Sequence, residues 1–391
     1  MHLPDYHGGS IVNLMRSIEA GLGARPCAAA SAYPELRDLP AGAIAGARNV
    51  MLLLIDGLGY DYLTRVGIGS SLAKNLKARI TSVFPSTTAT AVSAFLTGVG
   101  PQQHALSGWN TWLRELGCLA TVLRFCPRHG GEPFSKAGIA AGRIFTSEPL
   151  FDRLPLPGHM FAPHDIVNSD YNVFHCGTAT RHPYDANDME QAFVRCGALL
   201  QTAGRKFVHL YIPHIDWTAH AHGSNSAELL QKLQQLDAAY ARLLDGIRGT
   251  DTLVIATADH GFIDSPRESC IDLDDHPDLE RMLMLPLCGE RRVVYCYVQP
   301  GREPAFEHYV ETRLGHCAGL HRSADLASQG WFGLGPPNPR LAERIGDYTL
   351  VMKENYTLKD WIPGESRQLY IGVHGGISAA EMFVPLIVAE A

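Results

Sequence analysis

The chain has 391 residues, of which 46% are hydrophobic and 19% are charged, so it is long enough for one large globular domain or two modest ones. Its formal net charge of −7 argues against a surface that holds long nucleic acid, because binding many phosphates requires a dense face of lysine and arginine. The nine cysteines form no Cys-x-x-Cys pair, which argues against a thiolate zinc site and against a disulfide framework.

The first 45 residues are polar and contain several prolines, and we expect residues 1–45 to form an N-terminal extension that packs on the core. They lack the basic start and the apolar run of a secretory signal. Nowhere does the chain approach the roughly 18 uninterrupted apolar residues of a membrane span. We therefore expect a cytoplasmic protein that has no membrane partner.

A strand buried on both faces is predicted at Asn49–Ile55, where six apolar residues follow one another. Such a run is typical of the middle of a parallel sheet. Asp56 follows directly and is a candidate functional carboxylate. The alternative is an ordinary Asp-Gly turn, which is common after a strand.

A hydroxyl-rich segment, residues 81–90, precedes a predicted helix of small residues that reaches Gly98. A hydroxyl at the start of this helix would lie beside unpaired backbone N–H groups and the positive end of the helix dipole, where a phosphoryl oxygen binds well. A metal ion bound to that hydroxyl would lower its pKa and make it a nucleophile. The alternative is a Ser/Thr helix cap.

The next buried strand is predicted at Lys206–Ile212 and leads to Asp216. Asp216 and His220 are four residues apart, so on a helical turn both side chains face one direction and are able to hold one ion. The alternative is a polar surface turn. A stripe of leucines across residues 226–247 then predicts a helix that packs on the core.

A third buried strand, Thr252–Thr257, leads to Asp259 and His260. Two polar groups at the end of a core strand need partners, and one metal ion would satisfy both. The alternative is an aspartate that caps the next helix, with an exposed histidine beside it. Near the end of the chain, His374 precedes two glycines that allow close backbone approach, although a surface loop would also explain it.

The carboxyl ends of neighbouring strands in an α/β sheet share one edge, where ligands bind. We therefore expect Asp56, Asp216 and Asp259 to converge there with the histidines, which is the side-chain inventory of a two-metal hydrolase. Residues 109–174 and 262–346 are richer in glycine, proline and histidine and weaker in periodicity. They are predicted to be cap-like insertions that line the crevice and determine substrate choice.

The order and spacing of these motifs resemble the alkaline phosphatase superfamily and, within it, the type I phosphodiesterase and nucleotide pyrophosphatase family. The resemblance implies an α/β fold in residues 46–391: an alkaline phosphatase-like three-layer sandwich with a mostly parallel central sheet, helices on both faces and inserted cap segments. It rests on the motifs Leu54-Ile55-Asp56-Gly57, Phe84-Pro85-Ser86-Thr87-Thr88 with Thr97-Gly98, Asp216-x-x-x-His220, Ala258-Asp259-His260-Gly261, and His374-Gly375-Gly376 with Glu381-Met382-Phe383-Val384-Pro385.

The resemblance also implies two zinc ions per chain, with manganese left open as the metal used. The implied ligands are Asp216, His220 and His374 for one ion, and Asp56, Asp259, His260 and the nucleophile Thr88 for the other. The spacing to Thr97-Gly98 favours Thr88, and Thr87 and Thr90 remain alternatives. Relatives that cleave nucleotide diesters commonly carry Phe-Pro-Asn after the threonine, whereas this chain has Ala89-Thr90-Ala91, and Asn110 is a candidate substitute for the asparagine.

The implied function is hydrolysis of a phosphodiester or pyrophosphate bond in a small phosphorylated substrate, through a phosphothreonyl intermediate on Thr88. One alternative is a phosphomonoesterase or phosphonate hydrolase that uses the same two metals. A non-enzymatic alternative is a metal-stabilised protein that binds a phosphorylated ligand without turning it over. Sulfate ester cleavage is disfavoured because the Cys-x-Pro-x-Arg and Ser-x-Pro-x-Arg patterns of sulfatases are absent from the sequence.

Overall fold

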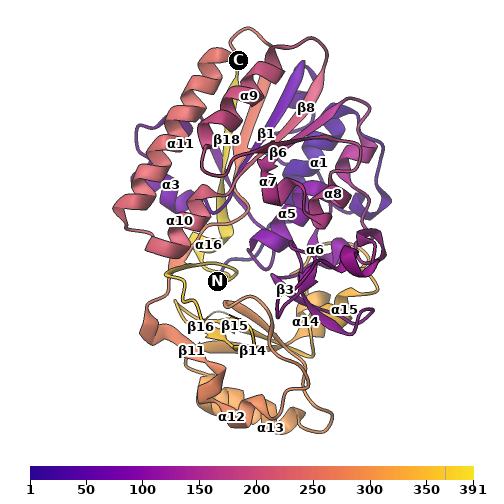
Figure 1. Ribbon diagram of the computed structural model, residues 1–391, viewed down its shortest axis with the longest axis vertical. Helices are drawn as coiled ribbons and strands as arrows, with labels where there is room; N and C mark the ends of the chain where they lie inside the picture. Colours follow the sequence, from indigo (N-terminus) through magenta and orange to yellow (C-terminus); the bar gives the residue numbers. More distant parts are fainter. Residues whose placement is uncertain (366) are drawn as a thin grey trace.

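The protein consists of two adjoining parts in a computed structural model that describes residues 1–365 and 367–391 (Figure 1). The larger part is a mixed sheet with helices on both faces, and the smaller part is built on an antiparallel sheet. The α/β class and the layered arrangement that the sequence predicts are therefore confirmed. No helix in the described ranges combines the length and the apolar character needed to cross a membrane.

The main sheet has seven strands, of which β18 pairs antiparallel with both of its neighbours while the remaining pairings are parallel. In spatial order they are β2 (Leu76–Thr81), β18 (Phe383–Glu390), β9 (Thr252–Thr257), β1 (Asn49–Ile55), β8 (Lys206–Ile212), β6 (Gly158–Pro163) and β7 (Thr180–Tyr184). The three runs predicted as buried strands are the adjacent central strands β9, β1 and β8, and each of their residues is buried. Because these three strands are parallel, their carboxyl ends share one edge of the sheet.

Helices cover both faces of this sheet (Figure 1). On one side lie α3 (Tyr60–Val66), α4 (Ser71–Lys74), α9 (Met189–Gln201), α10 (His214–His222) and α11 (Ala227–Gly246), with α11 packing on α4, α9 and α10. On the other side lie α1 (Ile11–Leu22), α2 (Gly42–Ala45), α5 (Thr88–Thr97), α6 (Pro101–His104), α7 (His164–Val167) and α8 (Asp170–His175). The predicted leucine-stripe helix is α11, and its N-terminus is capped by the Ser226 side chain, which accepts from the Leu229 N–H.

The smaller part is built on a second seven-stranded sheet, antiparallel throughout. Its order is β14 (Ala318–Arg322), β15 (Tyr348–Met352), β13 (Val293–Cys296), β12 (Cys288–Gly289), β3 (Asn110–Leu113), β4 (Cys118–Thr121) and β5 (Cys126–Pro127). Its helices are α12 (Pro277–Glu280), α13 (Glu303–Tyr309), α14 (Ser323–Ser328) and α15 (Leu341–Arg344). The remaining elements are the strand pairs β10 (Ile263–Asp264) with β17 (Gly372–Val373) and β11 (Cys270–Asp272) with β16 (Thr357–Lys359), and helix α16 (Ala379–Met382).

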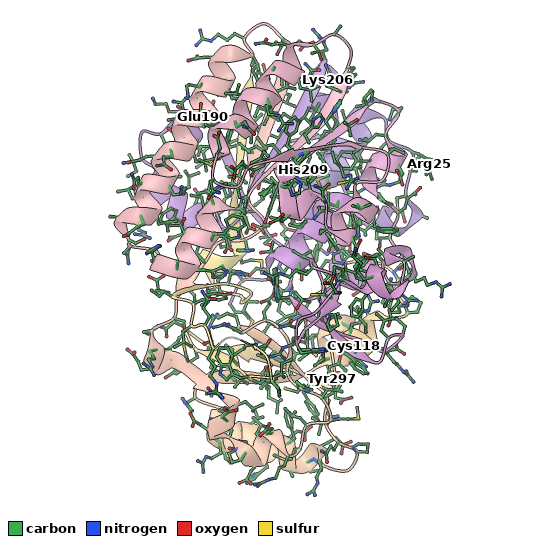
Figure 2. The ribbon with its side chains drawn as sticks, in the orientation of Figure 1. Arg25, Cys118, Glu190, Lys206, His209 and Tyr297 are labelled. Carbon is green, nitrogen blue, oxygen red and sulfur yellow. The ribbon has the colours of Figure 1, made fainter. Side chains whose placement is uncertain are left out.

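Both segments predicted as insertions contribute to this smaller sheet, residues 109–174 through β3, β4 and β5 and residues 262–346 through β12, β13 and β14. The first segment also supplies β6, which runs inside the main sheet. The predicted N-terminal extension supplies α1, whose buried side chains share one hydrophobic core with those of β1. Figure 2 shows His209 of β8 inside this larger part, whereas Arg25 lies at its edge. All nine cysteines are free.

One buried ion pair joins the two parts. Arg292, just before β13, donates from Nε and Nη2 to the two carboxylate oxygens of Glu381 in α16, at 3.0 Å each. Both side chains are almost completely buried. Glu381 also accepts from the Gly376 N–H at 2.8 Å, so the pair fixes the loop that follows His374.

Replacing Glu381 by alanine should lower the free energy of unfolding by about 3–5 kcal/mol, because the substitution leaves a buried guanidinium without its counter-ion. Urea denaturation followed by circular dichroism measures the change. The matched control is Asp245→Ala, which removes the acid of the exposed Arg248–Asp245 pair and should change stability by about 1 kcal/mol or less. Equal effects of the two substitutions would contradict a structural role for the buried pair.

Candidate active site

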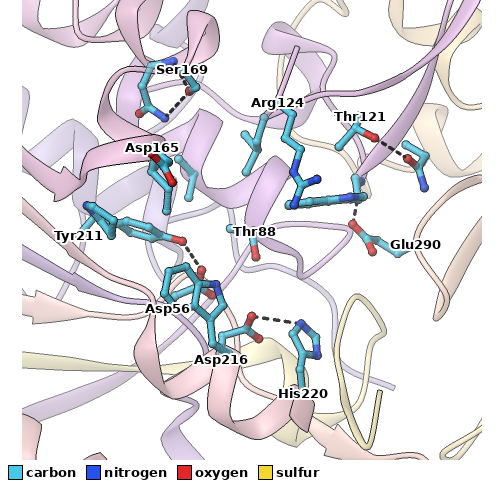
Figure 3. Close-up of a pocket in the computed structure, with 18 of the residues that line it drawn as sticks. Asp56, Thr88, Thr121, Arg124, Asp165, Ser169, Tyr211, Asp216, His220 and Glu290 are labelled. Atoms are coloured by element: carbon cyan, nitrogen blue, oxygen red, sulfur yellow. Dashed lines mark hydrogen bonds and ion pairs between the residues drawn. The ribbon is translucent and has the colours of Figure 1, made fainter. Parts of the chain in front are cut away.

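A cavity of about 1550 Å³ lies between the two parts, at the carboxyl ends of β1 and β8. Figure 3 shows Asp56, Thr88, Asp216 and His220 around its floor, with Glu290 from the smaller part facing them. The site is therefore at the sheet edge where the sequence predicts that the acids converge.

Asp216, His220 and His374 form one group of potential metal ligands, with one ligand atom from each within 4.8 Å of the others. Both Asp216 and His220 lie on α10 and face the same way, with Nε2 of His220 3.1 Å from Oδ2 of Asp216. His374 comes from the loop after β17, and its Nε2 lies 3.6 Å from Oδ1 of Asp216. The predicted Asp-x-x-x-His pair thus does share one face of a helix.

Asp56, Asp259, His260 and Thr88 gather on the other side of Asp216. Nε2 of His260 lies 3.3 Å from Oδ1 of Asp56, 3.4 Å from Oδ2 of Asp259 and 3.0 Å from Oγ1 of Thr88. Ligand atoms of Asp56, Asp216 and His260 also lie within 4.8 Å of one another, so Asp216 belongs to both groups. The rings of His260 and His374 stack with their centroids 3.7 Å apart. The two groups are therefore adjacent halves of one site.

The hydrogen bonds of the histidines direct their free nitrogens into the site. His220 contacts the Gly372 carbonyl through Nδ1 at 2.7 Å, and His260 contacts the Gly261 carbonyl through Nδ1 at 2.9 Å. When Nδ1 donates to a carbonyl, neutral imidazole presents a lone pair at Nε2, as in metal-binding histidines. Both Nε2 lone pairs then face carboxylate oxygens, an arrangement that a cation between them would stabilise.

Several buried polar atoms of the site have no hydrogen-bond partner within the described part of the chain. They are Oδ1 of Asp56, Oδ1 of Asp216, Oδ2 of Asp259 and Nδ1 of His374. A buried carboxylate oxygen without a partner is strongly unfavourable. These atoms are oxygen and nitrogen ligands of the kind that zinc and similar divalent ions take, so the residues fit a metal centre.

The electrostatics of the site agree with this fit. Burial, followed by the charges of Asp259 and Asp216, raises the pKa of Asp56 well above its usual range, and burial also raises the pKa of Asp259. Burial opposes ionisation of Asp216 as well, but the interaction with His220 holds the pKa of Asp216 below its usual value. The positive charge of the neighbouring side chains is therefore too small to compensate three buried carboxylates, and divalent cations would supply the rest.

Gly57 permits the close approach of β1 to α10. Its φ is +76°, and a Cβ at this position would lie only 2.9 Å from Cβ of Asp216. The Gly57 N–H also donates to Oδ1 of Asp259 at 3.0 Å. A glycine is needed here because any side chain would push two of the carboxylates apart.

The model of the type I phosphodiesterase/nucleotide pyrophosphatase family matches residues 50–376 of the chain. The chain belongs to this family. It is therefore a phosphoric ester hydrolase, and its family is metal-dependent, as the site's chemistry suggests. A comparison with curated proteins finds no match by sequence.

Solved structures of this phosphodiesterase family share the fold. Human ectonucleotide pyrophosphatase/phosphodiesterase 5 superposes with a TM-score of 0.65 at 15% identity, with 87% of each chain covered. The murine protein of the same name, as an inactive variant in complex with AMP, superposes with a TM-score of 0.63 at 15% identity and covers 86% of this chain and 87% of its own. The sheet order and the helical layers are therefore those of the phosphodiesterase fold.

The three threonines considered as nucleophiles differ in surroundings. Oγ1 of Thr88, at the start of α5, lies beside His260 in the cavity. Thr87, the residue before the helix, donates instead to Oε1 of Glu290 at 2.7 Å. Thr90 is completely buried and its hydroxyl has no partner in the described chain. Only Thr88 thus lies among the potential metal ligands.

Some residues of the site are not predicted from the sequence. Tyr211 in β8 donates its hydroxyl to Oδ2 of Asp56, and Glu290 accepts from Thr87 and from the Trp109 N–H. His209 and His164, which belong to none of the motifs singled out in the sequence, also line the cavity. The one available signal for Tyr211 was its place near the end of a predicted strand that leads to Asp216. Asn110 lines the cavity too, and its Oδ1 accepts from Thr121 at 3.3 Å.

Replacing Tyr211 by phenylalanine should weaken metal binding about 10- to 100-fold, because the hydroxyl orients the Asp56 carboxylate. Competition with a chromophoric chelator measures the affinity. Tyr240→Phe is the matched control, since it removes a buried hydroxyl on α11 that does not line the cavity, and its affinity should equal that of the unchanged protein. Equal affinity in both variants would show that Tyr211 plays no part in orienting Asp56.

Proposed function

We propose that the protein hydrolyses a phosphodiester or pyrophosphate bond of a small, nucleotide-like substrate, with two zinc ions and with Thr88 as the nucleophile. The observation that carries the proposal is the position of the Thr88 hydroxyl, 3.0 Å from His260 and at the first position of a ten-residue helix. A metal-binding protein without turnover has no need of a hydroxyl at this place.

The proposed ligands are two sets of side chains at the cavity. Asp216, His220 and His374 would hold one ion, and Asp56, Asp259, His260 and Thr88 the other. Support comes from the unpartnered carboxylate oxygens and from the Nε2 lone pairs directed at them. When bound, the ions supply a lowered pKa for the Thr88 hydroxyl and polarisation of the phosphoryl group.

The proposed reaction has two steps, attack by Thr88 and hydrolysis of the intermediate. Oγ1 of Thr88 attacks the phosphorus, the bond to the leaving oxygen breaks on the opposite side, and a phosphothreonyl intermediate forms. The first turn of α5 leaves backbone N–H groups without helical partners, and these donate to the phosphoryl oxygens as negative charge develops. Water then attacks the intermediate and regenerates the Thr88 hydroxyl.

Glu290 favours a diester over a monoester as the substrate. Its carboxylate is half-buried and accepts hydrogen bonds at 2.7 Å from the Thr87 hydroxyl and from the Trp109 N–H, directly beside the nucleophile. Burial raises the pKa of Glu290, but the two donors favour its ionised form. A negative charge at this place repels the dianion of a monoester more than the monoanion of a diester.

A nucleotide-like substrate is suggested by the AMP complex of the murine structural relative and by a cavity large enough for it.

Thr88→Ala should lower hydrolysis of bis-p-nitrophenyl phosphate and of a nitrophenyl nucleotide ester by at least about a thousandfold, because the nucleophile is lost. Metal content should stay near two ions per chain. Thr90→Ala is the matched control and should keep activity within about tenfold. Full activity of the Thr88 variant would exclude Thr88 as the nucleophile. Preference of the unchanged protein for p-nitrophenyl phosphate would favour the monoesterase alternative instead.

Removal of the metals with a chelator should abolish hydrolysis and lower the melting temperature, because ions that bind only the folded state stabilise it by about 4 kcal/mol at a thousandfold excess over Kd. Zinc should restore both properties.

His374→Ala should lose high affinity for one of the two ions, as titration calorimetry would measure. His308→Ala, at an exposed position in α13, is the control and should bind two. Two tight ions in the His374 variant would remove this residue from the ligand set.

A further inference from the structure

Besides the potential metal ligands, several lysine and arginine side chains line the cavity. Five of its lining residues are cationic, namely Arg124, Arg128, Lys136, Arg291 and Lys359. Three of them have partners within the protein: Arg128 pairs with Asp360 and Glu365, Lys359 pairs with Glu365, and Arg291 lies over the ring of Tyr370. Within the described residues, Arg124 and Lys136 have neither an ion pair nor a side-chain hydrogen bond.

Arg124 is held at the cavity by a rigid turn after β4. The next residue, Phe125, is completely buried and adopts a φ of +50°, which is rare for a residue with a large side chain. Its N–H donates to the Val122 carbonyl at 3.1 Å, and the Val122 N–H donates to the Trp109 carbonyl at 3.0 Å. Left-handed backbone of this kind persists only where the surroundings stabilise it, so packing at Phe125 fixes the turn that carries the exposed Arg124 side chain.

Lys136 lies close in sequence to Phe134, which packs against Phe125. The ring of Phe125 packs against Phe134 at a centroid distance of 5.2 Å, and the Phe134 N–H donates to the Phe125 carbonyl at 2.9 Å. Phe134 begins the short helical turn Phe134–Ala137, which presents Lys136 to the cavity. The two unpaired cations thus stand on one packed unit.

Arg124 points into the space above the nucleophile. In Figure 3 its guanidinium enters the cavity from the side opposite His220, and Thr88 lies between the two. Three acids that line the cavity have contacts of their own: Asp165 lies 3.2 Å from Nδ1 of His164, Asp170 accepts from the Ser135 hydroxyl, and Asp185 accepts from the Asn187 N–H. The guanidinium is therefore available to a ligand.

We propose that Arg124, assisted by Lys136, binds a second anionic group of the substrate, a carboxylate or a phosphate, while the metal groups hold the reacting phosphoryl group. The proposal rests on the proposed function, since it assumes a phosphoryl group at Thr88. A guanidinium forms two parallel hydrogen bonds with a carboxylate or a phosphate, so it selects an anion by shape as well as by charge. A neutral substituent would leave this side chain without a partner.

The test is calorimetric binding to the zinc-loaded Thr88→Ala protein of ω-carboxyalkylphosphonates and ω-phosphonooxyalkylphosphonates of increasing chain length. Each carboxylate is compared with its neutral amide, and each phosphate monoester with its neutral alcohol. Because the phosphonate anchors every ligand at the metals, the comparison isolates the second group. At the best chain length the anionic ligand should bind about 10- to 100-fold more tightly than its neutral counterpart.

Adding Arg124→Gln to the same protein should abolish this preference without changing the affinity for the neutral ligands. Lys136→Gln should reduce the preference by a smaller factor. Arg313→Gln, which removes an exposed cation that does not line the cavity, is the control and should keep it. The larger gain with carboxylate or with phosphate identifies which anion is preferred.

Equal affinities for anionic and neutral ligands would overturn the role of Arg124 and leave the proposed function standing. A preference that survives Arg124→Gln would overturn it as well. Phosphonates that bind equally with and without zinc would instead contradict the proposed function, so the two failures are distinguishable.

Discussion

The whole arrangement depends on three carboxylates buried at the ends of three adjacent parallel strands. β9, β1 and β8 are completely buried, so whatever follows them must be satisfied without water. Asp56, Asp216 and Asp259 follow these strands, and each keeps an oxygen with no partner in the described chain. Burial raises the pKa values of Asp56 and Asp259, and at Asp56 the charges of Asp259 and Asp216 raise it further. A site of this kind gains from cations far more than an exposed acidic cluster would.

The smaller sheet completes this site as well as covering it. Arg292, just before β13, donates to Glu381, and Glu381 accepts from the Gly376 N–H, so the position of the His374 loop depends on the ion pair between the two parts. Glu290, two residues earlier, fixes the Thr87 hydroxyl beside the nucleophile. One short segment of the small sheet therefore supports both a metal-ligand loop and the start of α5, which couples the stability of the cap to the geometry of the site.

The sequence predicts those parts of the protein whose structure is determined by residues that are close together in the sequence. Runs rich in apolar residues predict β1, β8 and β9 with their observed bounds, and the Asp216-x-x-x-His220 spacing predicts two side chains on one helical face. The cavity wall is different, because Arg124, Glu290 and Tyr211 reach the site through long-range packing that leaves no periodic pattern. Phe125 shows this: its φ of +50° depends on contacts with Phe134 and Phe145, which are distant in sequence.

This contrast also explains how proteins at 15% identity share the fold. The metal groups require a few side chains at strand ends, and many apolar sequences form such strands equally well. The wall is built on turns whose side chains do not support the central sheet, so they are free to change with the substrate. In this chain the position after Thr88 is occupied by Ala89, which is too small to contact a substrate substituent, and the unpaired Arg124 stands across the cavity instead. On the proposal that Arg124 binds the second anionic group, the cap recognises this part of the substrate and the helix of the nucleophile does not.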